Sequence, residues 1–143
     1  TAELGSMAVT EQVDALRVLA ASPVKKLVVP RVGALVLALP LLTVLADVVG
    51  LFGGMVMAVS EVGQSRAYFV SHVLGALRVQ DITSGIGKSI FFAVFVGIIA
   101  CYNGLAATGG ADGVGKATTN TVVTASIAII VSDFFLTKIF LLF

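Results

Sequence analysis

The sequence is poor in charge and in the residues that build catalytic and metal sites. Charged residues make up 12% of the chain, and nine Lys and Arg against eight Asp and Glu leave a net charge of +1. Nucleic-acid-binding domains carry a clustered basic face, so we expect no nucleic acid as a partner. With only one Cys, Cys101, the chain cannot form an intrachain disulfide, and its single His cannot form a metal cluster by itself. We therefore expect no catalytic residue, no metal and no cofactor in this chain.

Apolar residues are abundant instead. They make up 58% of the chain, and the mean hydropathy is +1.09. Three apolar runs, residues 32–59, 86–107 and 122–143, each reach the ~20 residues that cross ~30 Å of hydrocarbon. The sequence therefore predicts an all-α integral membrane protein, with a segment over residues 1–31 followed by a transmembrane domain over residues 32–143.

The first apolar run is longer than a bilayer requires, so its helix is expected to tilt, to kink at Pro40 or to extend beyond the hydrocarbon. Gly50 and Gly54 form a small-xxx-small pair that lets a neighbouring helix approach closely. These three residues are our predicted helix-packing positions.

The segment before the first run is predicted to contain an amphipathic helix that begins at Thr10 and ends before Pro23. Thr10 suits an N-cap, and acidic residues in the first turn suit the helix dipole. The polar residues of this helix are Glu11, Gln12, Asp14 and Arg17, and its apolar residues, at helical spacing, are Val13, Leu16 and Leu19. The pattern fits both an interfacial anchor without a partner and a helix that binds one.

The two connections differ in character. Residues 61–85 include apolar positions at helical spacing, which predict a short helix on the membrane surface. Residues 103–121 are rich in Gly and Thr and are predicted to form a turn region. Basic residues are more numerous on the side of residues 1–31 and 103–121 than on the other side, so the positive-inside rule predicts a cytoplasmic amphipathic segment.

One motif resembles a nucleotide site. Residues 110–117 nearly match the phosphate-binding pattern G-x-x-x-x-G-K-[ST], but Ala117 stands where a hydroxyl must bind magnesium. The segment also follows a predicted membrane span rather than a buried strand. We predict that it binds no nucleotide.

Ionisable residues inside the predicted spans are the strongest candidates for function. Asp47 and Asp133 lie well inside the first and third runs, and Lys88 lies near the start of the second. An acid at the centre of a membrane helix costs about 2.5–3.5 kcal/mol on insertion scales, so such a group normally faces protein or water. These residues are either structural contacts or part of a translocation path. We predict an ion pair between Asp47 and Lys88, because both should lie in the same outer part of the membrane.

Several motifs occur in a characteristic order along the chain. They are Val9-Thr-Glu-Gln-Val-Asp-Ala-Leu16, Leu39-Pro-Leu-Leu-Thr43, Tyr102-Asn-Gly104 and Gly113-Val-Gly-Lys-Ala-Thr-Thr119. Together with Asp81, Gly85, Lys88 and Ser89, they resemble the MlaE family, the permease subunits of MCE-linked ABC lipid transporters. Members of that family have about five spans of bilayer length, so this chain, which starts at Thr1, is expected to be the C-terminal part, with the last three.

The resemblance implies a set of partners. The helix that starts at Thr10 would be a coupling helix that docks on a separate ABC ATPase, and that ATPase would bind ATP and magnesium. A second permease copy would complete a homodimer, a ring of MCE proteins would bind on the periplasmic side, and a small STAS-type accessory subunit is a further candidate on the ATPase.

The resemblance also implies a function and a location. The chain would be a non-catalytic, multi-pass subunit in the bacterial inner membrane that moves phospholipid between this membrane and the MCE protein and so contributes to outer-membrane lipid asymmetry. Two alternatives stay open: an ion- or proton-coupled secondary transporter that uses Asp47 and Asp133, and a structural membrane subunit.

Overall fold

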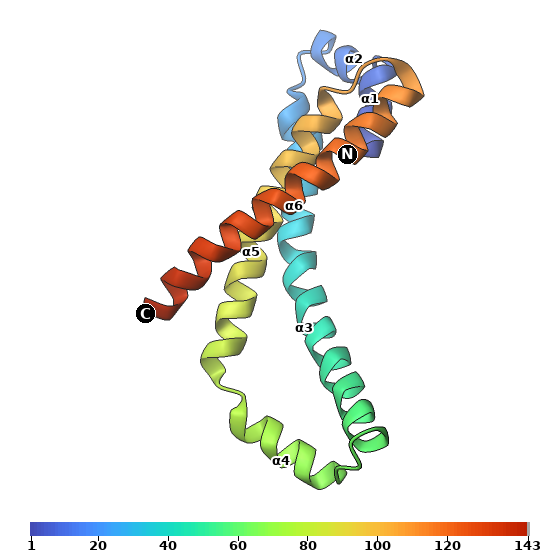
Figure 1. The fold of residues 1–143 in the computed structure, drawn as a ribbon. Coiled ribbons are helices and arrows are strands. Elements are labelled where there is room, and N and C mark those ends of the chain that lie inside the picture. The colour runs from blue at the N-terminus through green and yellow to red at the C-terminus, as the bar shows by residue number, and fades with distance from the viewer. Residues whose placement is uncertain (143) are drawn as a thin grey trace.

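A computed structural model describes the backbone of residues 1–142 and the side chains of residues 1–140. The described residues form helices and no strands, which confirms the all-α prediction. Three helices, α3 (Val29–Ser60), α5 (Val79–Leu105) and α6 (Gly110–Leu142), are long and apolar enough to cross a membrane (Figure 1). Phe143, where the third predicted span ends, lies outside the described residues.

The first long helix begins earlier than predicted. A short π-helical segment, η1 (Val24–Val28), runs directly into α3, so the apolar helix starts before Val32. Pro40 lies inside α3, and the helix continues on both sides of it. At about 1.5 Å per residue, the 32 residues of α3 extend roughly 48 Å, which exceeds the hydrocarbon thickness.

Two short helices precede α3. Helix α1 (Ala2–Val9) was not predicted, and α2 (Gln12–Val18) is shorter than the predicted amphipathic helix. The prediction of an N-cap at Thr10 is wrong, because Thr10 ends α1 and its hydroxyl donates to the carbonyl of Ser6 at 2.8 Å. Glu11 stands at the N-cap of α2 instead.

The connection between α3 and α5 contains the predicted short helix. Helix α4 (Arg66–Ala76) begins at Ser65, whose hydroxyl accepts a hydrogen bond from the backbone N–H of Tyr68 at 3.2 Å. Helix α4 lies at the opposite end of the molecule from α1 and α2 (Figure 1).

Helices α5 and α6 also begin earlier than their apolar runs. The carboxylate of Asp81 accepts a hydrogen bond from the backbone N–H of Arg78 at 3.1 Å and so fixes the start of α5. Helix α6 begins directly after Gly109, which has a φ of +87°. The prediction of a turn region up to residue 121 is therefore wrong beyond residue 109. Threonine hydroxyls in this stretch donate to carbonyls four residues earlier, as Thr118 does to Val114 at 2.8 Å, so the helix itself satisfies them.

Helix α5 is central, since it contacts α1, α3 and α6. Its buried face consists of small residues about one turn apart: Ser89, Ala93, Gly97, Cys101 and Gly104. Small side chains let helix backbones approach closely where no hydrophobic effect drives helices together. Helix α3 has no fully buried residue, and most of its apolar side chains are exposed, although Val32 and Leu35 pack against Gly97 of α5.

Candidate functional site

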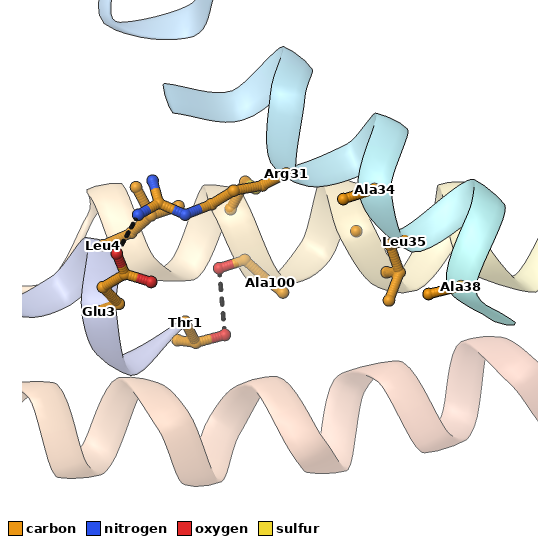
Figure 2. Close-up of a pocket in the computed structure, with 10 residues that line it drawn as sticks. Thr1, Glu3, Leu4, Arg31, Ala34, Leu35, Ala38 and Ala100 are labelled. Atoms are coloured by element: carbon orange, nitrogen blue, oxygen red, sulfur yellow. Dashed lines mark hydrogen bonds and ion pairs between the residues drawn. The ribbon is translucent and has the colours of Figure 1, made fainter. Parts of the chain in front are cut away.

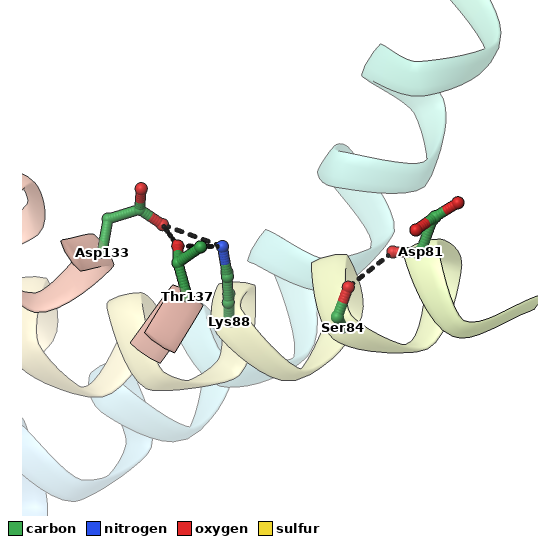
Figure 3. A network of polar contacts seen from close by, with 5 residues as sticks. All are labelled: Asp81, Ser84, Lys88, Asp133 and Thr137. Atoms are coloured by element: carbon green, nitrogen blue, oxygen red, sulfur yellow. Dashed lines mark hydrogen bonds and ion pairs between the residues drawn. The ribbon is translucent and has the colours of Figure 1, made fainter. Parts of the chain in front are cut away.

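A cluster of charged and hydroxyl groups joins α5 to α6 within their apolar lengths (Figure 3). Lys88 Nζ on α5 lies 3.2 Å from Asp133 Oδ1 and donates to Thr137 Oγ1 at 2.6 Å. Asp133 and Thr137 are one turn apart on α6, and the hydroxyl of Thr137 lies 3.4 Å from the same carboxylate oxygen. Each charge therefore has an opposite charge and a hydroxyl within reach.

This cluster corrects the predicted ion pair. Lys88 pairs with Asp133 and not with Asp47, which lies exposed on α3 and forms no ion pair with any described residue. Asp133 turns toward α5, where it meets Lys88. Helix packing determines the partner of Lys88, because α5 and α6 lie in contact where they carry Lys88 and Asp133.

Two open hollows flank the cluster, and Thr137 borders both. The more polar hollow has a volume of about 310 Å³ and is lined by Arg78, Gln80, Asp81, Ser84, Lys88, Thr137 and Phe140.

 The second hollow at the cluster, of about 510 Å³, is lined by Ile130, Asp133, Phe134, Thr137 and Lys138. The polar hollow brings two cationic groups, Arg78 and Lys88, to one concave surface.

Helix α2 holds most of the residues predicted to meet a partner. Glu11, Gln12 and Asp14 are exposed, and Arg17 donates to Asp14 at 2.8 Å. Val13, by contrast, is only 5% exposed, so it has little surface to offer a partner. Leu16 is half-buried, whereas the last apolar residues of this segment, Val18 and Leu19, are 86% and 75% exposed.

The end of α2 is set by its own backbone and not by Pro23. The N–H of Ala21 donates to the carbonyl of Leu16, and the N–H of Ala20 donates to that of Arg17, both at 3.0 Å. This is a Schellman turn, in which Ala20 has the left-handed φ of +55° that glycine usually provides. Exposed Val18 and Leu19 are thereby held at a sharp reversal of the chain.

The hollow beside α1 lies where α1, α3 and α5 meet (Figure 2). The hydroxyl of Thr1 donates to the carbonyl of Ala100 at 3.1 Å, and Arg31 Nη2 lies 2.5 Å from Glu3 Oε1. These contacts link the start of α1 to α5 and to α3. The rest of the lining is small or apolar, as at Ala34 and Ala38.

The nucleotide-like motif is helical. Residues 110–117 form the first two turns of α6, and Lys116 pairs with Asp112 at 2.8 Å on the exposed surface of this helix. A phosphate-binding loop needs non-helical backbone whose N–H groups point at the ligand. The backbone of residues 110–117 therefore differs from that of a phosphate-binding loop.

The predicted packing glycines have few neighbours in this chain. A Cβ at Gly50 would meet nothing within 4 Å, and one at Gly54 would meet only Phe69 of α4, at 3.8 Å. The close contacts on α5 are instead at Gly87, Gly97 and Gly104, which sequence reasoning missed. Small residues four apart along residues 89–101 were the signal that could have identified this face.

A buried polar contact was also missed. Asn103 on α5 donates to Thr121 Oγ1 on α6 at 3.0 Å, and Thr121 is only 6% exposed. Nothing in the sequence pairs these two residues, because they lie on either side of the connection that was predicted to be a longer turn.

Known proteins resemble this chain over nearly all of its length. A family model described as Permease MlaE matches residues 1–139. A probable ABC transporter permease protein of Synechocystis is 46% identical over 135 residues, which is 94% of this chain and 51% of that protein. A protein of the same description from Rickettsia typhi is 38% identical over 138 residues, or 96% of this chain and 53% of the relative.

A plant protein is also similar. Protein TRIGALACTOSYLDIACYLGLYCEROL 1, chloroplastic, of Arabidopsis thaliana is 42% identical over 139 residues, which is 97% of this chain and 40% of the relative. The chain spans about half the length of the curated relatives it matches.

Proposed function

The chain belongs to the MlaE permease family, and we propose that it forms the membrane part of an ABC transporter that moves phospholipid. It is a multi-pass membrane protein with three helices of spanning length. In this proposal the chain provides the path for the lipid and changes conformation with the ATPase. A separate ATPase subunit binds ATP and magnesium and supplies the energy.

The pairing of Lys88 with Asp133 is the observation that carries the lipid assignment. The two charges neutralise each other at 3.2 Å, so α5 and α6 present mainly apolar surface around one polar point. An apolar surface suits acyl chains, and the cation Arg78 in the neighbouring polar hollow suits a phosphate group. A path for ions would need a succession of polar groups through the membrane. The Arabidopsis relative, which bears the name of a glycerolipid, supports the same substrate class.

Helix α2 is the proposed docking element for the ATPase. It presents the exposed acids Glu11 and Asp14 together with exposed Val18 and Leu19, while Val13 holds the helix to its own chain. Apolar anchors surrounded by charged groups are typical of specific interfaces between proteins. On this proposal, the end of the molecule that carries α2 is cytoplasmic.

The remaining partners follow from the family. We propose a second permease copy, an MCE-protein ring at the end that carries α4, and a STAS-type subunit on the ATPase. The setting would be the bacterial inner membrane, where phospholipid exchange with the MCE ring would contribute to outer-membrane lipid asymmetry.

Charge reversal on α2 tests the docking. We expect the full-length permease with Glu11→Arg and Asp14→Arg to lose co-purification with its ATPase. Glu61→Arg is the matched control, because Glu61 is exposed at the opposite end of α3. An ATPase that co-purifies equally with the wild type, the Glu11→Arg/Asp14→Arg double variant and the Glu61→Arg control would contradict the proposed docking.

Transport by the purified complex tests the substrate. In proteoliposomes we expect ATP-dependent transfer of a fluorescent phospholipid to the MCE protein. We expect Asp47→Asn to leave this transfer unchanged, because Asp47 lies outside the Lys88 cluster. Transfer that instead follows an imposed proton gradient and is abolished by Asp47→Asn would favour the ion-coupled alternative.

A further inference from the structure

Helix α1 is closely packed against its neighbours in the described part of the chain. It contacts both α5 and α6, and Leu4 at its centre is only 1% exposed. Leu4 is the largest side chain that is fully buried, in a molecule whose other large apolar residues are mostly exposed. A helix so seated cannot shift without moving its neighbours, because packed interfaces rearrange between discrete positions and do not deform continuously.

The contact of α1 with α5 depends on Gly104. A Cβ at this position would lie 2.9 Å from Leu4 Cβ and 2.9 Å from the backbone oxygen of Thr1, which is closer than real Cβ atoms come. The contact with α6 is also close, since a Cβ at Gly5 would lie 3.2 Å from Val114 Cγ1. The backbone of α1 therefore rests directly against α5 and nearly against α6.

An ion pair connects α1 to α3, the first of the three long apolar helices. Glu3 on α1 and Arg31 on α3 lie 2.5 Å apart, and the side chain of Arg31 is only 31% exposed (Figure 2). Helix α1 is therefore in contact with α3, α5 and α6 together.

Helix α2 is joined to α1 by a short, hydrogen-bonded link. The N–H of Glu11 donates to the carbonyl of Ala8 at 3.2 Å, and the carbonyl of Glu11 accepts from Ala15 at 3.0 Å. Glu11 itself has a left-handed φ of +60°, so the link has one defined conformation in place of a flexible loop. A displacement of α2 would therefore be passed to α1.

We infer that α1 transmits movement of α2 to all three membrane helices, through its contact with Gly104 and the Glu3–Arg31 pair. The inference rests on the proposed docking of α2 on an ATPase. It assigns to these residues a positioning role, which links ATP hydrolysis to lipid movement without contact with nucleotide or lipid.

Gly104→Ala tests the close contact in the complete transporter. We expect the ATPase to co-purify normally and to hydrolyse ATP, while phospholipid transferred per ATP falls at least roughly fivefold, the lower end of typical couplings between sites. Gly115→Ala is the matched control, because a Cβ there meets nothing within 4 Å although Gly115 lies at the same end of the molecule. Wild-type transfer per ATP in Gly104→Ala would overturn the inference.

A charge swap tests the link to α3 and does not depend on the folding of the glycine variant. We expect Glu3→Arg and Arg31→Glu each to lower transfer per ATP, and the double variant to recover most of it. A double variant no better than either single change would overturn the role of this pair. If charge reversal at Glu11 and Asp14 leaves ATPase docking unchanged, the proposed function itself is overturned. Failure of the proposed function is thereby distinguished from failure of the role assigned to α1.

Discussion

At the end that carries α1, α5 meets its neighbours through glycine and small residues, whereas toward α4 the helices α3 and α5 diverge (Figure 1). At the first end, Gly97 lies against Val32 and Gly104 lies against Leu4. At the second, large apolar side chains such as Phe52 and Met57 are 64% and 62% exposed.

The comparison separates two uses of apolar residues in one chain. Near α1 they fill space between helices, so their loss leaves a cavity. Along most of α3 they are exposed and form a surface that lipid or another protein must cover, so the loss of an exposed one removes little contact within this chain. The stability of this chain should therefore respond to substitutions near α1 far more than to similar substitutions on α3.

The largest effect is expected at Leu4. We expect Leu4→Ala to lower the free energy of unfolding of the full-length permease in detergent by about 2–5 kcal/mol, the range for a buried Leu truncated to Ala. Leu37→Ala on α3, where Leu37 is 72% exposed, is the matched control and should change little. If SDS titrations show that Leu4→Ala and Leu37→Ala lower the free energy of unfolding equally, packing near α1 is no more important for stability than the surface of α3.

Hydropathy was sufficient to predict the number and kind of the long helices, because ~20 consecutive apolar residues have few alternatives to a membrane helix. Their starting points could not be predicted as well. The Gly- and Thr-rich stretch before Val122 resembles a loop, yet hydroxyls such as that of Thr118 bond to the preceding turn and allow the helix to continue. Helix α1 was missed because its burial depends on tertiary contacts of Leu4.

The second prediction concerns the ion pair that joins α5 and α6. We expect Lys88→Met to destabilise the protein by about 2–3 kcal/mol, since it leaves Asp133 without a counter-ion among apolar helices. Lys88→Met combined with Asp133→Leu should recover most of this loss, because two apolar residues can replace an ion pair at little cost. A double variant less stable than Lys88→Met would show that the carboxylate of Asp133 stabilises the protein mainly through a group other than Lys88, such as Thr137.

The partner of Lys88 illustrates what the sequence alone could not decide. Depth in the membrane allowed Asp47 as a partner, but only the packing of α5 against α6 brings Asp133 to Lys88. Residue type and position along the chain therefore identified the charged residues of the candidate site, and helix packing determined how they pair.

A smaller effect is expected at the buried hydrogen bond near α1. We expect Thr121→Val to cost about 1 kcal/mol, because hydrogen bonds between membrane helices contribute about 0.6–1.7 kcal/mol and this change leaves the amide of Asn103 without its acceptor. Ser126→Ala is the control, because the exposed hydroxyl of Ser126 bonds only to its own helix, at Val122. If both variants unfold at the same SDS concentration, the hydrogen bond between Asn103 and Thr121 contributes nothing measurable to stability.

The smallest effect is expected at Gly87, where close packing involves a side chain and not a backbone. A Cβ at Gly87 would lie 2.9 Å from the ring atom Cζ of Phe140, whereas one at Gly85 would meet nothing within 4 Å. Because a ring can rotate away, we expect Gly87→Ala to be less stable than Gly85→Ala by only about 1 kcal/mol, the low end for overpacking. Adding Phe140→Leu to both variants should remove the difference, because the three nearest atoms to a Cβ at Gly87 all belong to this ring. A difference that persists without the ring would mean that α5 and α6 touch through their backbones here as well, and the contrast between the two ends of the molecule would then be weaker than the packing around Gly104 indicates.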